Sequence, residues 1–531
     1  MRTSNLSLMA MALHSASAYV WPNKYDSLED LLVIQSGYLR FGFTDLVVPC
    51  GFGQDLPGIN TAGEWMRTAF HDTITHDKAA GTGGLDGSIR WETNRPENPG
   101  KAFNDTLGQM ASFISPVIST ADMIALGLVA SVASCGGKRI PLRAGRIDAP
   151  HAGPPGVPEP QTNLKDTTAQ FAKAGFNVTD MIAMVACGHS IGQVHSVDFP
   201  DIVTGTPEAS NVAKFDRTSA QFDNKVVSEY LESDGINPLA FGHNDTTNSD
   251  KRIFGADGNV TMQSLNDGNT YQDRCQDILA RMIDTVPANV TLSDPLDPID
   301  IKPYINTLEI NSAGTGIDFA GRIRIRTSAS TGRNADAMSV NLTLTDHNGA
   351  QSVIPAIRPS LKLGQSVGFL NEAFTWYEFS TTLDLEASAK SFVINVQDGN
   401  VTATYSNEEA GSYPIETDLL FQSSGSCLNV TTSADGMFAL NVKVAVRSNI
   451  TEDDVVVPVA HKVFTDNVVS PSLDIQQSPV KGKGETIGPY QIYTLNSTII
   501  PAGWITTFQP SLASKTSTVW PWISTGSLNN C

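Results

Sequence analysis

The apolar residues of this chain change their period about halfway along it, and this change limits the folds open to it. Up to about residue 286, apolar residues recur every three or four positions, which predicts helices with one buried face. Beyond residue 303 they alternate with polar residues, which predicts strands, and Asn348-Gly349 provides a tight turn. The predicted helices are 60–77, 120–134, 179–191 and 270–286, and the clearest strands are 321–326, 339–344 and 439–444.

Prolines at positions 287, 295, 298 and 303 separate these two patterns. With 531 residues the chain is also too long for one ordinary core. We therefore expect a multidomain protein, with a mainly α-helical domain at residues 19–290 and a domain resembling a β-sandwich at residues 296–531. At two predicted helix starts, the hydroxyls of Thr120 and Thr179 can cap free backbone amides.

The first 18 residues have the features of a secretory signal peptide. Arg2 is followed by a short apolar stretch and by the small-residue cleavage site Ala16-Ser17-Ala18. Asn-x-Ser/Thr glycosylation acceptors then occur along both halves, as expected of a secreted, extracellular glycoprotein. They begin at Asn104, Asn177, Asn244, Asn259, Asn289, Asn341, Asn400, Asn429, Asn449 and Asn496.

Charge and hydropathy exclude several classes of partner. The formal net charge of -20 disfavours binding to nucleic acid or to an anionic membrane surface. No apolar run after the leader is long enough to span a bilayer. We expect a soluble monomer. Its six cysteines, in an oxidising compartment, favour disulfides over free thiols.

The segment 65–72 carries the first pair of reactive side chains. On a helix, Arg67 and His71 project from one face, one turn apart. An imidazole can take a proton from one oxygen of a peroxide and return it to the other, while a guanidinium stabilises the developing charge. On its own, the pair is equally compatible with a surface helix that happens to carry an arginine and a histidine.

A second histidine, His189, ends an otherwise apolar helix. Taken alone, such a histidine is more often a core residue than a ligand. However, Gly188 and Gly192 on either side allow a large flat group such as a porphyrin to approach closely. His195 lies six residues further on, too far round a helix to share one metal face with His189.

With these motifs, residues 28–286 resemble the plant, fungal and bacterial haem peroxidase superfamily, most closely its secreted fungal class (class II-like). The shared motifs occur in the family's order and at roughly its spacing. They are the Arg-x-x-Phe-His-Asp helix, the loop 83–88, Cys-Gly-His-Ser-Ile-Gly, the segment 215–223, and Ser249-Asp250 with Ile253-Phe254.

The resemblance implies an enzyme with haem b as cofactor and hydrogen peroxide as oxidant. It implies that His71 is the distal acid–base group, Arg67 its electrostatic partner, and Asn98, supported by Glu92, the residue that orients the imidazole. On the proximal side it implies that His189 binds the haem iron and that Asp250 accepts a hydrogen bond from its ring. Phe70 and Phe215 are the aromatic residues implied next to the haem.

The resemblance also implies two Ca²⁺ ions, for which clustered oxygen ligands are suited. The implied distal ligands are Asp72, Gly84, Asp86 and Ser88. The implied proximal ligands are Ser190, Asp216, Thr218, Gln221 and Asp223. The family has a disulfide where Cys50 and Cys135 stand; Cys187–Cys275 and Cys427–Cys531 are then the remaining pairs.

Departures from the family pattern bear on the electron donor. Phe70 and Phe215 occupy places where the intracellular branch has tryptophan, which favours a ferryl intermediate with a porphyrin-centred radical. The three acidic ligands of a manganese site correspond to Asn60, Glu64 and His195, so manganese oxidation is disfavoured. Met184 replaces the surface tryptophan used for bulky aromatics. We therefore expect small phenolic or similar organic donors.

Two other functions stay open. The chain can be a non-enzymatic cell-wall or surface protein in which the haem domain is a scaffold, because the large β-rich domain is absent from the familiar fungal peroxidases. Alternatively, the β-rich domain can hold an active enzyme on cell-wall polysaccharide through stacking aromatic residues. These are Trp376, Tyr377, Trp504, Trp520 and Trp522, for which core packing is the favoured explanation.

Overall fold

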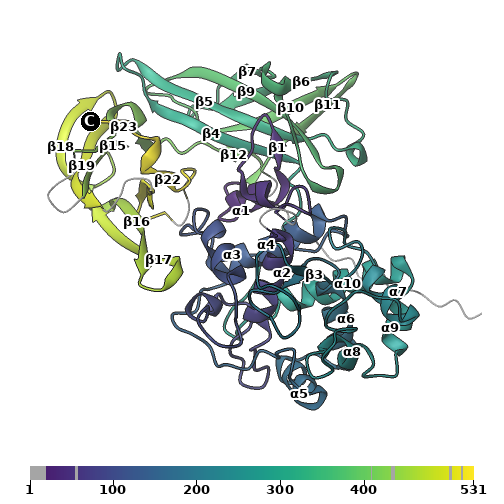
Figure 1. Ribbon diagram of the computed structural model, residues 1–531. Coiled ribbons are helices and arrows are strands. Elements are labelled where there is room, and N and C mark those ends of the chain that lie inside the picture. The colour runs from purple at the N-terminus through teal and green to yellow at the C-terminus, as the bar shows by residue number, and fades with distance from the viewer. Residues whose placement is uncertain (1–18, 54–57, 408–409, 432–436, 501–504, 516–517) are drawn as a thin grey trace, which may run out of the picture.

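The computed structural model describes residues 19–53, 58–407, 410–431, 437–500, 505–515 and 518–531. The predicted signal peptide, residues 1–18, lies outside this range. Helices fill the first half of the described chain and mostly antiparallel strands the second (Figure 1), which confirms the predicted fold class.

The helices are α1 (Asp26–Val33), α2 (Thr61–Thr73), α3 (Ala102–Met110), α4 (Thr120–Ser134), α5 (Leu164–Ala174), α6 (Val178–Gly188), α7 (Lys225–Glu232), α8 (Ser249–Phe254), α9 (Val260–Leu265) and α10 (Gly268–Ile283). The strands are β1 (Ser36–Gly37), β2 (Gln193–His195), β3 (Val212–Lys214), β4 (Ile301–Ile310), β5 (Gly316–Arg326), β6 (Met338–Thr345), β7 (Gln351–Ala356), β8 (Gln365–Val367), β9 (Ala373–Asp384), β10 (Ser391–Asp398), β11 (Val401–Tyr405), β12 (Tyr413–Pro414), β13 (Leu419–Phe421), β14 (Cys427–Asn429), β15 (Phe438–Arg447), β16 (Val455–Thr465), β17 (Val468–Pro479), β18 (Lys481–Ile487), β19 (Tyr490–Ile500), β20 (Thr506–Phe508), β21 (Ser511–Leu512), β22 (Ile523–Ser524) and β23 (Asn529–Asn530).

All four predicted helices form, but both predicted caps are wrong. At the start of α4, the side chain of Ser119, one residue before Thr120, accepts a hydrogen bond from the backbone amide of Asp122. The helix α6 begins with a capping box between Asn177 and Asp180. The cap with the required extended backbone lies one residue before Thr120 and two residues before Thr179, so each threonine falls inside its helix.

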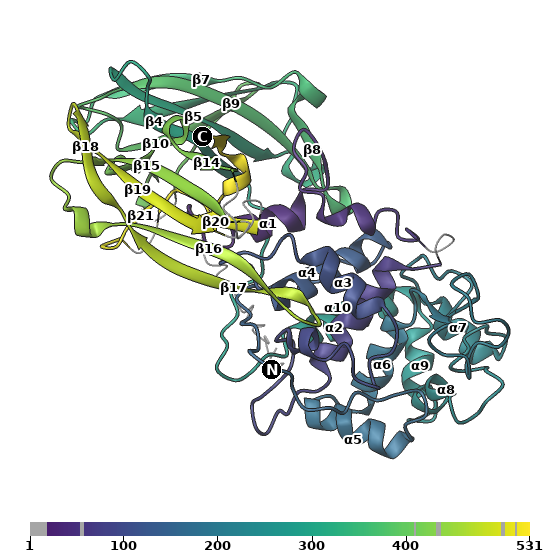
Figure 2. The same ribbon diagram turned by 60° about the vertical axis from the view of Figure 1, so that its left-hand side comes forward.

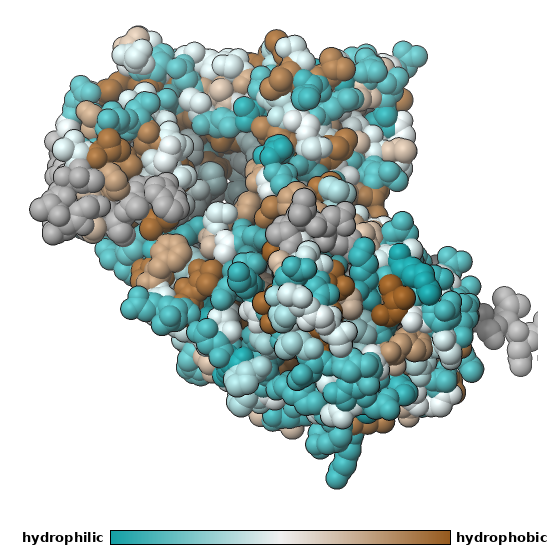
Figure 3. Space-filling model, in the orientation of Figure 1, coloured by the Kyte–Doolittle hydropathy of each residue, from teal (hydrophilic) through white to brown (hydrophobic). Residues whose placement is uncertain are grey.

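The helical half packs around α4, which is buried along nearly its whole length. Two disulfides staple this half, Cys50–Cys135 and Cys187–Cys275, and Cys427–Cys531 ties the last residue of the chain to β14. All three are the expected pairs. On the face seen in Figure 3, the helical half shows mainly hydrophilic residues, and no helix in the described range is long and apolar enough to cross a bilayer.

The second half contains two pairs of sheets. The first pair has the strand orders β1-β8-β9-β5-β4 and β11-β10-β6-β7, with Phe319 and Phe392 in contact between them. The second pair has the orders β18-β19-β15-β14-β23 and β17-β16-β20-β22, with Phe421 packed on Phe508. The predicted turn at Asn348-Gly349 joins β6 to β7, where Gly349 takes a positive φ of 85°.

The two halves are joined by more than the chain between them (Figure 2). β1, from the N-terminal segment, is an edge strand of the first sheet and pairs with β8. Beside it, α1 packs on β4 and β5 through a buried ionic cluster. The cluster pairs Glu29 and Asp30 with Lys302 and Arg324, whose side chains are at most 8% exposed.

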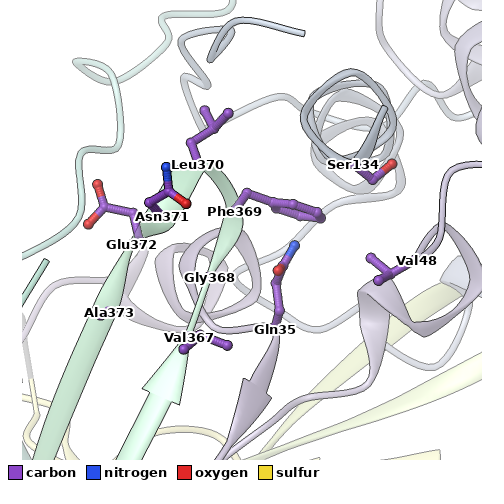
Figure 4. A pocket seen from close by; sticks show the side chains of 10 residues that line it. All are labelled: Gln35, Val48, Ser134, Val367, Gly368, Phe369, Leu370, Asn371, Glu372 and Ala373. Carbon is purple, nitrogen blue, oxygen red and sulfur yellow. The ribbon is translucent and has the colours of Figure 1, made fainter. Parts of the chain in front are cut away.

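A solvent-open cavity of about 510 Å³ lies at this junction (Figure 4). The ring of Phe369 points across it toward Ser134 at the end of α4, beside Gln35. None of the predicted site residues lines it. Of the aromatic residues considered for polysaccharide binding, Trp376, Tyr377 and Trp520 are buried in the core, and Trp504 lies outside the described residues.

Candidate active site

The distal side of the site is built on α2. His71 and Arg67 lie one turn apart on it, and His71 is only 8% exposed. The Nδ1–H of His71 donates to Oδ1 of Asn98 at 2.7 Å, and the amide of Asn98 donates to the backbone carbonyl of Glu92 at 3.0 Å. Because Nδ1 carries the proton, Nε2 of the neutral ring is the nitrogen free to accept one.

Arg67 is held close to this ring by a backbone carbonyl and by aromatic faces. Its guanidinium donates to the carbonyl of Pro99 at 3.3 Å and lies over the rings of Phe103 and Phe199, at 4.6 and 5.6 Å from their centroids. Burial lowers the pKa of Arg67 to about 10, so it stays charged at neutral pH. Burial and the charge of Arg67 together lower the pKa of His71 to about 3, so its imidazole is neutral and ready to act as a base.

The proximal side begins where α6 ends. His189 directly follows the helix, and its Nδ1–H donates to Oδ2 of the fully buried Asp250 at 2.8 Å. The same carboxylate oxygen accepts from the side-chain amide of Asn237 at 2.8 Å. The ring of Phe215 stacks on the imidazole at 4.3 Å. These contacts fix the ring and leave its Nε2 as the nitrogen available for a metal.

The two histidines and their surroundings fit a haem. Each has its Nδ1 occupied by a side-chain oxygen, so each presents Nε2. The side chain of His189 remains 31% exposed although its partner is buried. A Cβ added to the neighbouring Gly188 would meet no described atom within 4 Å other than those of its chain neighbours and its own helix backbone, so the end of α6 next to His189 has open space around it.

The predicted distal calcium ligands come together where the loop 84–88 meets the end of α2. The carboxylate of Asp72, fully buried, accepts from the amides of Gly87 and Ile89 at 2.7 and 2.8 Å and from the hydroxyl of Ser88 at 3.4 Å. Burial and the nearby charge of Asp86 raise the pKa of Asp72 well above its usual value. Gly84 belongs to the same loop, with a φ of 105° and so little space that a Cβ would lie 2.5 Å from the carbonyl of Thr285.

The predicted proximal ligands form a second loop. Thr218 donates its amide to Asp216 and its hydroxyl to Asp223. Oδ2 of Asp216 is buried and has no hydrogen-bond partner among the described residues, and burial raises the pKa of Asp216 to about 7. Ser190 lies beside this loop, because Ile191 pairs with Ala220.

Gln221 fits this set less directly than the other residues. Its side chain is exposed, so its backbone carbonyl is the atom left to serve as a ligand. In the described part of the chain, no three His, Cys, Asp or Glu side chains are grouped so as to hold a metal ion. A calcium ion at the predicted proximal site would therefore depend on hydroxyl and carbonyl oxygens as well as on carboxylates.

Sequence reasoning missed three contributors to the site. Asn237 reaches Asp250 from a loop, Phe103 packs on both His71 and Arg67, and the carbonyl of Pro99 anchors the guanidinium. A residue that acts through its backbone, or from a loop without a motif, leaves no periodic signal in a single sequence.

Most of the helical half is similar to a known protein family. The family model described as "Peroxidase" matches residues 54–265. A "WSC domain-containing protein" of Arthroderma benhamiae is 36% identical over 487 residues, which cover 91% of this chain and 64% of the relative. "L-ascorbate peroxidase 5, peroxisomal" of Arabidopsis thaliana is 34% identical over 33% of this chain and 60% of its own length.

"Cytochrome c peroxidase, mitochondrial" of Yarrowia lipolytica is 31% identical over 24% of this chain and 40% of its own length. The chain therefore spans less than two thirds of the length of each of these curated relatives. The match to the Arthroderma protein runs through both halves, whereas the peroxidase matches cover a third of the chain or less. The narrower assignment to the secreted fungal class stays a prediction.

Proposed function

We propose that this chain, whose residues 54–265 form a domain of the plant, fungal and bacterial haem peroxidase superfamily, reduces hydrogen peroxide with haem b and oxidises small organic donors. One observation carries the proposal. Two histidines each present Nε2, one beside the half-buried Arg67 and the other backed by the buried Asp250. The first arrangement suits proton transfer and the second suits iron binding.

The distal residues handle the proton and the charge. Nε2 of His71 accepts a proton from the first oxygen of the peroxide and gives it to the departing oxygen, which leaves as water. Arg67 stabilises the negative charge that develops on that oxygen. Asn98 keeps the ring in the tautomer that this transfer needs. Haem, when bound, would supply the redox chemistry of the reaction, accepting electrons from the donor.

The proximal residues would hold the haem. His189 would bind the iron through Nε2, while Asp250 makes the ring more basic through the hydrogen bond at Nδ1. Asn237 and the stacked Phe215 keep the pair from rotating.

We also propose a calcium ion in each loop. The support is electrostatic: Asp72 and Asp86 lie close together with little solvent, and Asp216 has a buried oxygen without a partner. A divalent cation would compensate these charges, which otherwise cost free energy on burial.

For the electron donor, the side chains favour small phenol-like molecules. Met184 is 2% exposed and offers no surface aromatic ring. Asn60 caps α2 by accepting from the amide of Gly63, and burial together with Asp105 raises the pKa of Glu64 to about 8. Asn60, whose side-chain oxygen already accepts a hydrogen bond, and Glu64, which is mostly neutral, are therefore poor ligands for manganese. An organic electron donor fits these side chains better.

Secretion and glycosylation are part of the proposal. The leader-like first residues and the acceptor sites support them, and so do three formed disulfides with no free cysteine among the described residues.

Turnover of a small phenol tests the function. The haem-loaded full chain should oxidise it only when peroxide is present, and His189→Ala should lose haem. If the protein holds haem through His189 but gives no peroxide-dependent turnover, the scaffold alternative stands instead. Polysaccharide binding by residues 296–531 stays a separate prediction, and sedimentation of the full chain with insoluble polysaccharide tests it.

A further inference from the structure

One hairpin of the β-rich half reaches across to the helical half. The β16–β17 hairpin extends from the second pair of sheets over α3 (Figures 1 and 2). Val469 and Leu473 on β17 pack against the core of the helical half. Val469 lies so close to α3 that a Cβ on Gly108 would be 3.5 Å from its side chain.

Polar contacts fix the end of this hairpin. The hydroxyls of Ser470 and Thr120 are 3.0 Å apart, and both residues are almost completely buried. On the other strand, Nζ of Lys462 donates to the carbonyls of Ala111 and Ser112, just after α3, at 2.8 and 2.9 Å. Buried or charge-assisted hydrogen bonds of this kind hold a contact in one geometry.

The hairpin makes a third contact with Arg90, which is 5% exposed and belongs to a short 3-10 helix, Ser88–Trp91. Its guanidinium donates to the carbonyl of Pro471 on β17 at 3.3 Å and to the carbonyl of Ala149 at 3.2 Å. The turn is thus clamped between the hairpin and the loop after α4.

The same turn supports the distal residues. The amide of Ile89 donates to Asp72, the residue after His71, at 2.8 Å. Immediately after the turn, the backbone carbonyl of Glu92 accepts a hydrogen bond from the side-chain nitrogen of Asn98. The side-chain oxygen of Asn98 in turn accepts the hydrogen bond from His71. Both supports of the distal imidazole therefore start from one short segment.

We infer that the β16–β17 hairpin braces the distal side of the site by fixing the turn Ser88–Trp91, and through it the orientation of His71. The β-rich half then has a part in the chemistry as a positioning element, in addition to any binding of its own. The catalytic part of this inference rests on the proposed peroxidase function, whereas the structural part does not.

The test uses the full chain with Lys462→Met and Ser470→Ala combined. Hydrogen–deuterium exchange of the haem-free protein is measured at residues 87–98, together with the rate of the haem-loaded protein with peroxide. Because the double variant loses three hydrogen bonds between the hairpin and the helical half, we expect exchange there to be at least about tenfold faster. The peroxide rate should fall while the KM for the donor stays unchanged.

The matched control is Gln477→Ala, an exposed position on β17, which should behave as the wild type. Lys462→Arg with the native Ser470 should restore protection of 87–98. If the double variant folds poorly, Ser470→Ala alone is measured in its place, and a smaller increase in exchange at residues 87–98 is expected.

Unchanged exchange at 87–98, or faster exchange spread evenly over the chain, would overturn the brace. A wild type that is inert to peroxide would instead overturn the proposed function and leave the exchange result to decide the inference.

Discussion

At the scale of single residues, the site depends on which nitrogen of each histidine is occupied. Both His71 and His189 use Nδ1 for a hydrogen bond to a side-chain oxygen, but the partner differs. In the proposed function, the neutral amide of Asn98 orients a base, whereas the buried carboxylate of Asp250 increases the electron density on an iron ligand. Two chemically identical side chains thereby take two different tasks.

The first prediction concerns the base. His71→Ala should slow the reaction with peroxide by about 10²–10⁴-fold, because general acid–base catalysis contributes that much. Stopped-flow absorption measures the rate, and haem content should stay at the wild-type level because His189 is intact. A rate within a few-fold of the wild type would contradict the assigned role.

The second prediction concerns the charge beside that base. Arg67 lowers the pKa of His71, so removing the charge in Arg67→Gln should raise it. Since only the neutral imidazole accepts a proton, the rate should fall on acidification through this pKa, near pH 3 in the wild type and at a higher pH in the variant. Rates measured across pH, with the exposed Arg40→Gln as control, test the shift. An acid limb that does not move would contradict the coupling.

At the scale of elements, the loop after β3 contains a buried carboxylate that is only partly paired. In the loop after β3, Asp216 is buried with one oxygen that lacks a partner, next to Asp223 and Glu229. Burying a carboxylate oxygen without a hydrogen-bond partner costs free energy, unless a cation or a proton neutralises its charge.

The third prediction follows from the pKa of Asp216, raised to about 7 when no cation is bound. A carboxyl group whose pKa is higher in the folded than in the unfolded state stabilises the folded protein only while it is protonated. The calcium-free protein should therefore lose stability as pH rises from about 4 to about 7. Melting temperatures with a chelator should show this loss, and added Ca²⁺ should remove it. In Asp216→Asn the calcium-free protein should lose this pH dependence. Equal melting curves with and without Ca²⁺ at pH 7 would contradict a bound ion.

Elements were more predictable from the sequence than their ends. The residues of α4 form one continuous, almost wholly apolar run, and its bounds, Thr120–Ser134, agree with the prediction. The caps were wrong because Ser119, Thr120 and Asn177 can all accept an amide, and only the backbone conformation decides between them. The motif residues were predictable since each combines a reactive group with a fixed spacing.

At the scale of the whole molecule, the two halves share secondary structure and buried charge. The sequence predicts two domains but not that a two-residue strand, β1, joins the sheet of the second. Nor does it show that Glu29 and Asp30 meet Lys302 and Arg324, which lie 273 to 295 positions further along the chain. Such contacts depend on tertiary geometry that no local pattern encodes.

The fourth prediction concerns that cluster. Arg324→Met should destabilise the protein by about 3–5 kcal/mol, because it leaves buried carboxylates without their partner. Urea denaturation measures the change. Lys251→Met, which breaks the exposed pair with Asp245, should change stability by less than about 1 kcal/mol. Equal effects of the two substitutions would show that the buried cluster does not couple the halves.

The most direct test of the proposed peroxidase function is the absorption spectrum of the haem-loaded full chain, before and after one equivalent of hydrogen peroxide, beside that of His71→Ala. We expect a Soret band that bleaches and shifts at once in the wild type, recovers when a small phenol is added, and changes far more slowly in the variant. A haem band that peroxide leaves unchanged, or that responds equally in both proteins, would contradict it.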